Sequence, residues 1–245
     1  MTKIITSLQN QLVKDAVALH LKKYRDEFGV FLIEGEQPCM AAIGYGWECV
    51  TMFVQENRDD ITEESAVFVT QEILQKISKK DNPQNIIGVF KQRHNTIPTN
   101  ASFYLALEEV RDPGNLGTIM RTAHAVGVEN IILIDQCCDP FNPEVIRASM
   151  GSFSAIHLSA MTQTEFLDWQ QQHKLALIGT DVVNATDYRE TDYTDAIIVM
   201  GNEQKGLSHE LKSRCTARVH IPMPGGTESL NLSIATGLLL YQNLN

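Results

Sequence analysis

The part of the chain that follows residue 100 alternates short β-like runs with helix-like segments, and this alternation constrains the fold more than any other feature. A predicted strand, Phe103–Val110, is followed by a predicted helix, Thr118–Val126, and by a second predicted strand, Asn130–Ile134. A strand–helix–strand unit of about 30 residues folds as a crossover that places its two strands parallel. Further strands are predicted at Leu175–Gly179, Ala196–Met200 and Ala217–Ile221, and a final helix at Leu230–Tyr241. The sequence therefore predicts an α/β domain with a parallel sheet.

The first part of the chain has a different pattern and predicts a second, smaller α/β domain. Its β-like runs lie at Val30–Ile33, Val50–Val54, Ala66–Val69 and Ile86–Phe90, with helix-like segments between them. A polar stretch that contains Pro98 separates the two patterns. We therefore expect a domain at residues 1–95, a linker at 96–101 and a second domain at 102–245.

The net charge of the chain argues at first sight against a nucleic-acid partner. The chain has 20 Lys and Arg against 30 Asp and Glu, a net charge of −10, whereas proteins that bind nucleic acids usually carry a basic surface. The acidity is uneven, because residues 1–95 hold 11 basic and 13 acidic side chains while residues 96–245 hold 9 and 17. Basic side chains gather in the first domain at residues 22–25, 76–80 and 91–93. Such runs are most often solvated helix faces, but they are also able to contact phosphates.

The remaining composition is typical of a soluble globular chain. Hydrophobic residues make up 43% and charged residues 20% of the 245 positions. The longest strongly apolar stretch, Leu230–Tyr241, is 12 residues long, and a helix that spans a bilayer needs about 20. The five cysteines are odd in number and form no C-x-x-C pair, which argues against disulfides and against a structural zinc site. We therefore expect a cytoplasmic protein without a membrane segment.

Three predicted loops, each directly after a strand, are candidates for the ligand site, because ligands bind at the carboxyl ends of parallel strands. They are Arg111–Gly117, Gly201–Ser208 and Pro222–Ser229, and all are rich in Gly, Asn, Glu and Pro. The second has the glycine spacing of a phosphate-binding P-loop, but Leu207 stands where that loop has its lysine. No G-x-G-x-x-G follows a predicted strand, and G-x-S-x-G and H-E-x-x-H are absent. This pattern argues against dinucleotide enzymes, α/β-hydrolases and zinc proteases.

The three loops resemble the three motifs of one enzyme family. Glu109–Ala123, with the sequence EVRDPGNLGTIMRTA, resembles the first motif of the SpoU (TrmH-like) RNA 2′-O-ribose methyltransferases. Ile198–Ser208 resembles their second motif and Ile221–Ala235 their third, in the same order along the chain. In the first domain, Phe31–Gly35 and Asn82–Val89 are similar to the L30e-like substrate-binding domain of this family.

The resemblance implies an enzyme that transfers a methyl group from S-adenosyl-L-methionine to a ribose 2′-hydroxyl in RNA. An alcohol is a weak nucleophile, so the protein must orient the hydroxyl and help to remove its proton while the carbon–oxygen bond forms. The sulfonium donor is already activated, so no metal is expected. The family fold is a parallel-sheet domain with a deep C-terminal trefoil knot of the SPOUT type, and its members are homodimers with composite active sites.

Five residues match polar positions of the family's motifs and are our candidates for catalysis. Arg121 matches the essential arginine, and since a guanidinium keeps its proton, we expect it to hold an RNA phosphate and polarise the hydroxyl. Asn115 lies six residues earlier, where it also suits a helix N-cap. Glu203 is expected to orient Arg121 or the amides of the first loop. Ser229 and Asn231 offer a hydroxyl and an amide to the methionine end of the cofactor or to the ribose.

Four further residues are our candidates for holding S-adenosyl-L-methionine. Gly201, Ile221 and Leu230 match positions that hold this cofactor in the family, and Met223 adds to the apolar wall. Apolar residues at such positions are individually more often core than cofactor contacts, so these assignments depend on the resemblance.

The sequence leaves three hypotheses for the function. The leading one is 2′-O-methylation of ribosomal RNA of the 23S type, because the additional first domain favours it over the shorter tRNA enzymes. A tRNA 2′-O-ribose methyltransferase is the second. The third is a non-catalytic RNA-binding protein that keeps the fold. The joint presence of the five polar motif residues argues against the third, since a site without catalysis should lose some of them.

Overall fold

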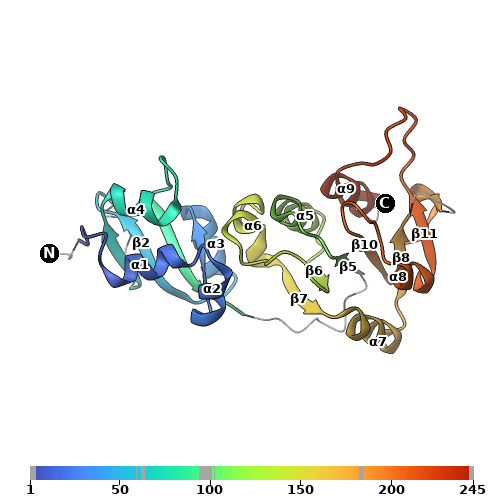
Figure 1. The fold of residues 1–245 in the computed structure, drawn as a ribbon, viewed down its shortest axis with the longest axis horizontal. Helices are drawn as coiled ribbons and strands as arrows, with labels where there is room; N and C mark the ends of the chain where they lie inside the picture. The colour runs from blue at the N-terminus through green and yellow to red at the C-terminus, as the bar shows by residue number, and fades with distance from the viewer. Residues whose placement is uncertain are drawn as a thin grey trace. The chain divides into compact units, whose positions relative to one another are not determined.

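The structure, a computed structural model, describes residues 4–58, 60–61, 64–93, 101, 103–181 and 185–242. The chain divides into two compact units (Figure 1). The first unit contains Met1–Arg93 and Asp139–Ser154, and the second contains His94–Cys138 and Ala155–Asn245. Of the predicted linker, residues 96–101, only Ala101 lies within the described residues. The largest difference from the predicted domains is that residues 139–154 belong to the first unit.

A four-stranded mixed sheet forms the centre of the first unit. Its strands are β1 (Val30–Glu34), β2 (Cys49–Gln55), β3 (Ala66–Val69) and β4 (Ile86–Lys91), in the order β1-β4-β2-β3. Strand β4 is antiparallel to both neighbours, and β2 and β3 are parallel. The helices are α1 (Gln11–Ala18), α2 (Lys22–Phe28), α3 (Glu36–Gly44), α4 (Gln71–Ser78) and α6 (Pro143–Ala148). Apolar side chains of α1 and α4, among them Val13, Ile73 and Ile77, pack in one core with Phe53 and Val89 of the sheet.

Aromatic packing holds residues 139–154 in the first unit. The ring centroid of Phe31 on β1 lies 5.0 Å from that of Phe141 and 5.4 Å from that of Phe153. Trp47 joins this cluster, and its Nε1 donates to the last backbone carbonyl of the segment at 3.0 Å. Because large aromatic side chains bury the most apolar area, a cluster of this kind fixes the segment on the sheet.

A buried ion pair holds the other end of the segment. Nη2 and Nε of Arg25 on α2 lie 2.6 and 3.0 Å from Oδ2 of Asp139. Nη1 of Arg25 donates to the carbonyl oxygen of Leu19 at 2.7 Å. The Arg25 side chain is only 2% exposed, so its charge depends on Asp139 for compensation.

A seven-stranded sheet forms the second unit, and it confirms the predicted α/β fold with a parallel sheet. The strand order is β7-β6-β5-β10-β8-β11-β9, and the paired strands are parallel. The strands are β5 (Phe103–Glu108), β6 (Asn130–Ile134), β7 (His157–Met161), β8 (Ala176–Thr180), β9 (Thr186–Asp187), β10 (Ala196–Met200) and β11 (Ala217–His220). The helices are α5 (Pro113–Ala125), α7 (Gln163–His173), α8 (His209–Arg214) and α9 (Leu232–Gln242), with a short 3₁₀ turn at Tyr188–Glu190. A second 3₁₀ turn, Ser152–Ala155, spans the point in the sequence where the segment of the first unit ends.

The direction in which the chain adds strands to the sheet changes at β5, and the candidate site lies at this point. From β5 the chain proceeds to β6 and β7 on one side, and it later returns to place β10 directly beside β5 on the other. In an open parallel sheet, the loops that leave two such neighbouring strands diverge around a crevice at the carboxyl edge. The loops after β5 and β10 therefore border this crevice.

Helices α5 and α9 pack against each other (Figure 1). A Cβ atom on Gly237 of α9 would lie 3.5 Å from the methyl carbon of Thr122 on α5. The third predicted loop connects β11 to α9. A trefoil knot describes how the chain passes through one of its own loops, and the predicted knot stays a prediction. In the described part of the chain, each helix is too short or too polar to cross a bilayer.

The substitution Asp139→Ala should destabilise the first unit by about 3–5 kcal/mol, because it leaves the buried guanidinium of Arg25 without its counter-charge. The measurement is urea unfolding followed by ¹⁹F NMR of protein labelled with 5-fluorotryptophan. Trp47 reports on the first unit and Trp169 on the second.

The matched control is Asp26→Ala, which removes an acid from the exposed ion pair of Lys22 and Asp26. Exposed pairs contribute about 0–1 kcal/mol, so the Trp47 midpoint should move little in this variant. Equal destabilisation by the two substitutions would contradict the assigned role of the buried pair.

Candidate active site

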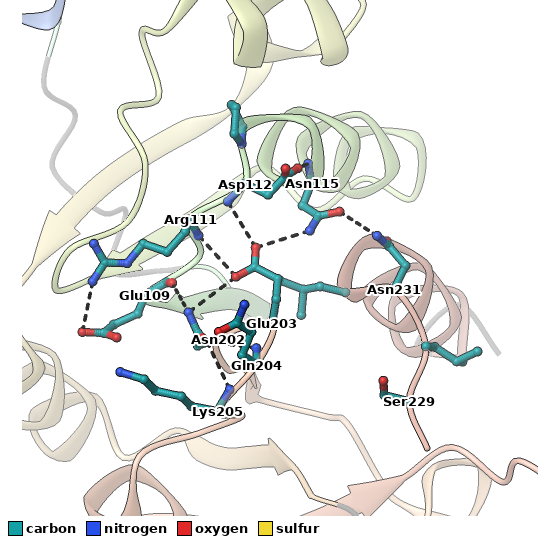
Figure 2. Close-up of a pocket in the computed structure, with 13 residues that line it drawn as sticks. Glu109, Arg111, Asp112, Asn115, Asn202, Glu203, Gln204, Lys205, Ser229 and Asn231 are labelled. Carbon is teal, nitrogen blue, oxygen red and sulfur yellow. Dashed lines mark hydrogen bonds and ion pairs between the residues drawn. The ribbon is translucent and has the colours of Figure 1, made fainter. Parts of the chain in front are cut away.

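A hollow of about 910 Å³ lies where the three predicted loops meet (Figure 2). Its volume is within the usual range for small-molecule sites. It is lined by Glu109, Arg111, Asp112, Pro113, Asn115, Asn202, Glu203, Gln204, Lys205, Ser229, Leu230, Asn231 and Leu232. The candidates from the sequence that line it are Asn115, Glu203, Ser229, Leu230 and Asn231.

The first loop is shorter than predicted, because α5 begins at Pro113 rather than at Thr118. Oδ1 of Asp112 accepts a hydrogen bond from the amide of Asn115 at 2.7 Å, so Asp112 is the N-cap. The predicted capping role of Asn115 is therefore wrong, and its side chain faces the hollow instead (Figure 2). The Asp-Pro pair is itself a signal for a helix start, and it is the sequence signal from which this cap could have been predicted.

The loop after β10 is a tight turn with Glu203 near its tip. Asn202 and Gly206 exchange two backbone hydrogen bonds of 2.9 and 3.1 Å, and Oδ1 of Asn202 accepts from two amides inside the turn. A Cβ atom on Gly201 would lie 2.2 Å from the carbonyl carbon of Gly206. Gly201 is therefore required by the turn itself, and Asn202 is a site residue that the sequence analysis missed.

The carboxylate of Glu203 connects this turn to the first loop. Oε1 accepts from the amide of Asp112 at 3.2 Å and from Nδ2 of Asn115 at 3.3 Å, and Oε2 accepts from the amide of Arg111 at 3.4 Å. Partial burial raises the pKa of Glu203, but these hydrogen bonds outweigh it and hold the pKa below its usual value. Glu203 is thus an anion that orients the amides of the first loop, one of the two tasks considered for it above.

Asn231 connects the third loop to the other two. Its Nδ2 donates to Oδ1 of Asn115 at 3.0 Å, and Nδ2 of Asn115 in turn donates to Glu203 (Figure 2). Oδ1 of Asn231 accepts from the amide and the hydroxyl of Ser233 at 2.9 and 2.6 Å, which satisfies the first turn of α9. A single chain of hydrogen bonds therefore joins Asn115 to Glu203, which lies 88 positions later, and to Asn231, which lies 116 positions later.

Residues 221–231, all of them described, keep polar groups available for a ligand. Outside the strand ladders, the amide of Gly226 is the one in this loop that donates to a backbone oxygen of a described residue, that of Met223. The hydroxyl of Ser229 has no hydrogen bond with a described residue and lines the hollow (Figure 2). Open backbone groups and a hydroxyl beside the apolar side chains of Leu230 and Leu232 are a combination typical of a small-molecule site.

The other four candidates, Arg121, Gly201, Ile221 and Met223, lie outside the lining of the hollow. Arg121 is exposed on α5 and makes no ion pair or hydrogen bond with a described residue. Positions six apart on an α-helix point in directions that differ by about 120°, so Arg121 does not share the face of Asn115. Arg121 is therefore a free cation on the surface of the second unit.

Two protein-family models match the chain. The model of the SpoU rRNA Methylase family matches residues 102–241, and that of the MRM3-like substrate binding domain matches residues 10–88. The chain belongs to the SpoU rRNA methylase family. The membership inferred from the three motifs is thereby confirmed, together with a substrate-binding domain in the first part of the chain.

Relatives of this SpoU rRNA methylase cover almost its whole length. The 23S rRNA (guanosine(2553)-2′-O)-methyltransferase RlmP of Bacillus subtilis is 30% identical over 98% of both chains. A crystal structure of AdoMet-bound rRNA methyltransferase from Sinorhizobium meliloti is 38% identical, with a TM-score of 0.91 over 99% of this chain and 97% of that chain. The SpoU methyltransferase AviRb of Streptomyces viridochromogenes, in complex with AdoMet, is 25% identical, with a TM-score of 0.85 over 96% and 97%.

The substitution Glu203→Gln should lower the stability of the second unit in a pH-dependent way. Because the folded-state pKa lies below the usual value, the ionised carboxylate stabilises the fold above the unfolded-state pKa, and this contribution is lost as the pH falls through the folded-state pKa. The difference in urea midpoint between wild type and variant, read from the ¹⁹F signal of Trp169, should therefore shrink on going from pH 6 to acid.

The control for this experiment is Glu228→Gln, which removes an exposed carboxylate that has no hydrogen bond with a described residue. A difference in urea midpoint between wild type and Glu203→Gln that stays constant over the same pH range would show that the amides of the first loop do not hold the carboxylate.

Proposed function

We propose that this chain transfers a methyl group from S-adenosyl-L-methionine to a ribose 2′-hydroxyl of ribosomal RNA of the 23S type. The observation that carries the proposal is the Asn231–Asn115–Glu203 chain, which brings the three motifs of a SpoU rRNA methylase to one hollow. The substrate named for the Bacillus subtilis relative and the AdoMet-bound structure from Sinorhizobium meliloti support the assignment.

In this proposal, residues 221–231 and the turn after β10 hold the cofactor. When bound, the cofactor supplies a methyl group on a sulfonium that needs no further activation. Leu230 of the lining, with Ile221 and Met223 of the same loop, gives apolar contacts, and Gly201 lets the turn close beside them. The free hydroxyl of Ser229 orients the methionine end or the ribose, and Asn231 is itself fixed by Asn115.

The reaction forms a bond between the ribose oxygen and the methyl carbon, breaks the carbon–sulfur bond, and releases the hydroxyl proton. Arg121 is the group that we assign to this oxygen. Its guanidinium holds an adjacent RNA phosphate and stabilises the negative charge that develops on the oxygen. The exposed position of Arg121, away from the Asn115 face, fits a site completed by a second subunit.

We propose a homodimer in which α9 lies at the interface. Ile234, Leu238 and Tyr241 follow one another at helical spacing and are 57%, 39% and 54% exposed, and an apolar stripe of this kind is typical of a covered surface. Helix α9 packs on α5, which carries Arg121. A second copy on this stripe thus brings Arg121 of one subunit towards the hollow of the other.

We further propose that the two domains have different roles. Residues 1–95 bind the RNA and residues 102–245, with the trefoil knot, carry out the transfer. The match to a substrate-binding domain at residues 10–88 supports the first assignment. A ribosomal RNA substrate and five free thiols support a cytoplasmic location.

The function is tested by incubating the protein with labelled S-adenosyl-L-methionine and ribosomal RNA from cells that lack the gene. Label should enter the RNA at one ribose, and the bond that follows this ribose should resist alkaline hydrolysis, because the 2′-oxygen can no longer attack the phosphate. Transfer to tRNA alone would replace ribosomal RNA as the substrate, and absence of transfer to either RNA would contradict the proposal.

The substitution Arg121→Ala should reduce methyl transfer by at least about a hundredfold, in line with the loss of one group that stabilises developing charge. Affinity for S-adenosyl-L-methionine, measured by calorimetry, should stay within a few-fold of wild type, because Arg121 does not line the hollow of its own chain. Near-normal turnover in this variant would refute the assigned role.

The substitution Ile234→Glu should convert the dimer to a monomer in analytical ultracentrifugation, because it places a charge in the proposed apolar interface. Leu12→Glu is the matched control, since Leu12 is 44% exposed on α1 of the first unit. A wild-type monomer, or a dimer that survives Ile234→Glu, would contradict the interface.

A further inference from the structure

Asn202, at the start of the turn after β10, makes hydrogen bonds in two directions (Figure 2). Its Oδ1 accepts from the amides of Gln204 and Lys205 at 2.9 and 3.1 Å, inside its own turn. Its Nδ2 donates to the backbone carbonyl oxygen of Glu109 at 2.9 Å, 93 positions away in the sequence. Amides donate and a carbonyl accepts, so one orientation of the Asn202 side chain satisfies all three contacts. The side chain therefore joins the second loop to the end of β5.

Glu109 has a backbone conformation that a residue with a side chain seldom adopts. Its φ is 50°, in the left-handed region, where Cβ approaches the following carbonyl oxygen. Of the described residues that line the hollow, it is the one with a positive φ. Its side chain forms a 3.4 Å ion pair with Arg111 in which both partners are partly exposed, and such pairs contribute little. The conformation therefore depends on contacts of the Glu109 backbone.

Two contacts hold the backbone of Glu109. Its amide donates to the carbonyl oxygen of Ile134, the last residue of β6, at 3.2 Å, and its carbonyl oxygen accepts from Asn202. Because Glu109 directly follows β5, its conformation sets the direction in which the chain enters the first loop. Unfavourable backbone conformations persist where the surrounding structure fixes them, and they are concentrated at functional sites.

We infer that Asn202 is a positioning residue for the methyl transfer, which rests on the function proposed above. By holding the carbonyl of Glu109, it keeps the left-handed turn at the end of β5. This turn presents the amides of Arg111 and Asp112 to the carboxylate of Glu203. The two amides lead into α5, the helix that carries two of the catalytic candidates.

The Asn202 side chain acts on the loop and not on the reacting atoms, because its hydrogen-bonding capacity is used within the protein. Its oxygen has two lone pairs, which the two amides of its own turn occupy. Its nitrogen has two hydrogens. One is donated to Glu109, and the other faces Oε2 of Glu203, with 3.5 Å between nitrogen and oxygen.

The test is a double-mutant cycle of Asn202→Asp and Glu109→Gly. Asn202→Asp keeps the acceptor for the turn and replaces the donor to Glu109 by a second acceptor. Glycine adopts a positive φ without a steric penalty, so Glu109→Gly removes the need for support from Asn202. The negative charge that Asn202→Asp adds is present in both backgrounds and cancels in the comparison. Asn202→Asp should therefore have a smaller effect in the Glu109→Gly background than in the wild type.

Each protein is measured in two ways. Methyl transfer to ribosomal RNA is resolved into kcat and the KM for RNA, and hydrogen exchange of the amides of Arg111 and Asp112 is followed without substrate. In the wild-type background, Asn202→Asp should lower kcat about tenfold and speed exchange of both amides by about the same factor. The KM for RNA should change by less than about twofold, because the first domain is assigned to RNA binding. With Glu109→Gly, each effect should fall below about threefold.

Asp195→Gly provides the matched control background. Asp195 is exposed, has a φ of 48°, and directly precedes β10, so it lies at the opposite edge of the sheet from Asn202. The substitution releases a left-handed residue without touching the contact between Asn202 and Glu109. Asn202→Asp should keep its full effect on kcat and on exchange in this background.

Equal effects of Asn202→Asp on exchange in all three backgrounds would overturn the positioning role and limit Asn202 to its own turn. A loss confined to the KM for RNA would overturn it as well. Absence of methyl transfer to any RNA would instead contradict the proposed function, and the exchange comparison would still decide the role of Asn202. A ¹⁹F signal of Trp169 that matches wild type in each variant shows that the second unit is folded.

Discussion

The carboxylate of Glu203 is the group on which the arrangement of the site depends. It lies at the N-terminus of α5, where the first amides of a helix lack partners within the helix and carry a partial positive charge. Glu203 accepts hydrogen bonds from the amides of Arg111 and Asp112, and through Asn115 it is connected to Asn231. One anion from the second loop therefore fixes the first loop directly and the third loop indirectly. The strand order makes this contact possible, because β10 lies beside β5.

The strands were the part of the fold that the sequence predicted best, and all four strands of the first unit were predicted to within one residue at each end. Strands β6 and β10 have the predicted bounds, and β10 is buried along its whole length, so its continuous apolar run carries a clear signal. The start of α5 was predicted too late, because the glycines after Pro113 resemble a loop and hide the cap formed by Asp112. Strand β7 was missed, since its sequence, HLSAM, combines polar and apolar residues at the edge of the sheet.

Contacts between distant parts of the chain were beyond what the sequence patterns predict. Arg25 and Asp139 are 114 positions apart, and neither residue shows by its neighbours that the two form a buried pair. The same holds for Phe141 and Phe153, whose partners on the first sheet are known only once the fold is known. For the site, the motifs gave residues that line the hollow, such as Asn115 and Glu203, but they did not show that Arg121 faces away from it. In the proposed dimer, the role of Arg121 depends on a second subunit, and local sequence patterns do not describe an assembly.

The acidity of the chain is compatible with an RNA substrate because screening makes the local arrangement of charge more important than its sum. At physiological salt, charges more than about 8 Å apart hardly interact across solvent, so most of the 30 acidic side chains do not act on a phosphate bound elsewhere. Those that lie near cations are largely paired with them, as Glu34 is with Lys80. At the hollow, the carboxylate of Glu203 accepts hydrogen bonds from amides, and these lower its effective charge towards a ligand. Lys205, which lines the same hollow without an ion pair to a described residue, keeps its full charge available. A net charge of −10 therefore limits where RNA can bind on this protein, and it does not decide whether RNA binds.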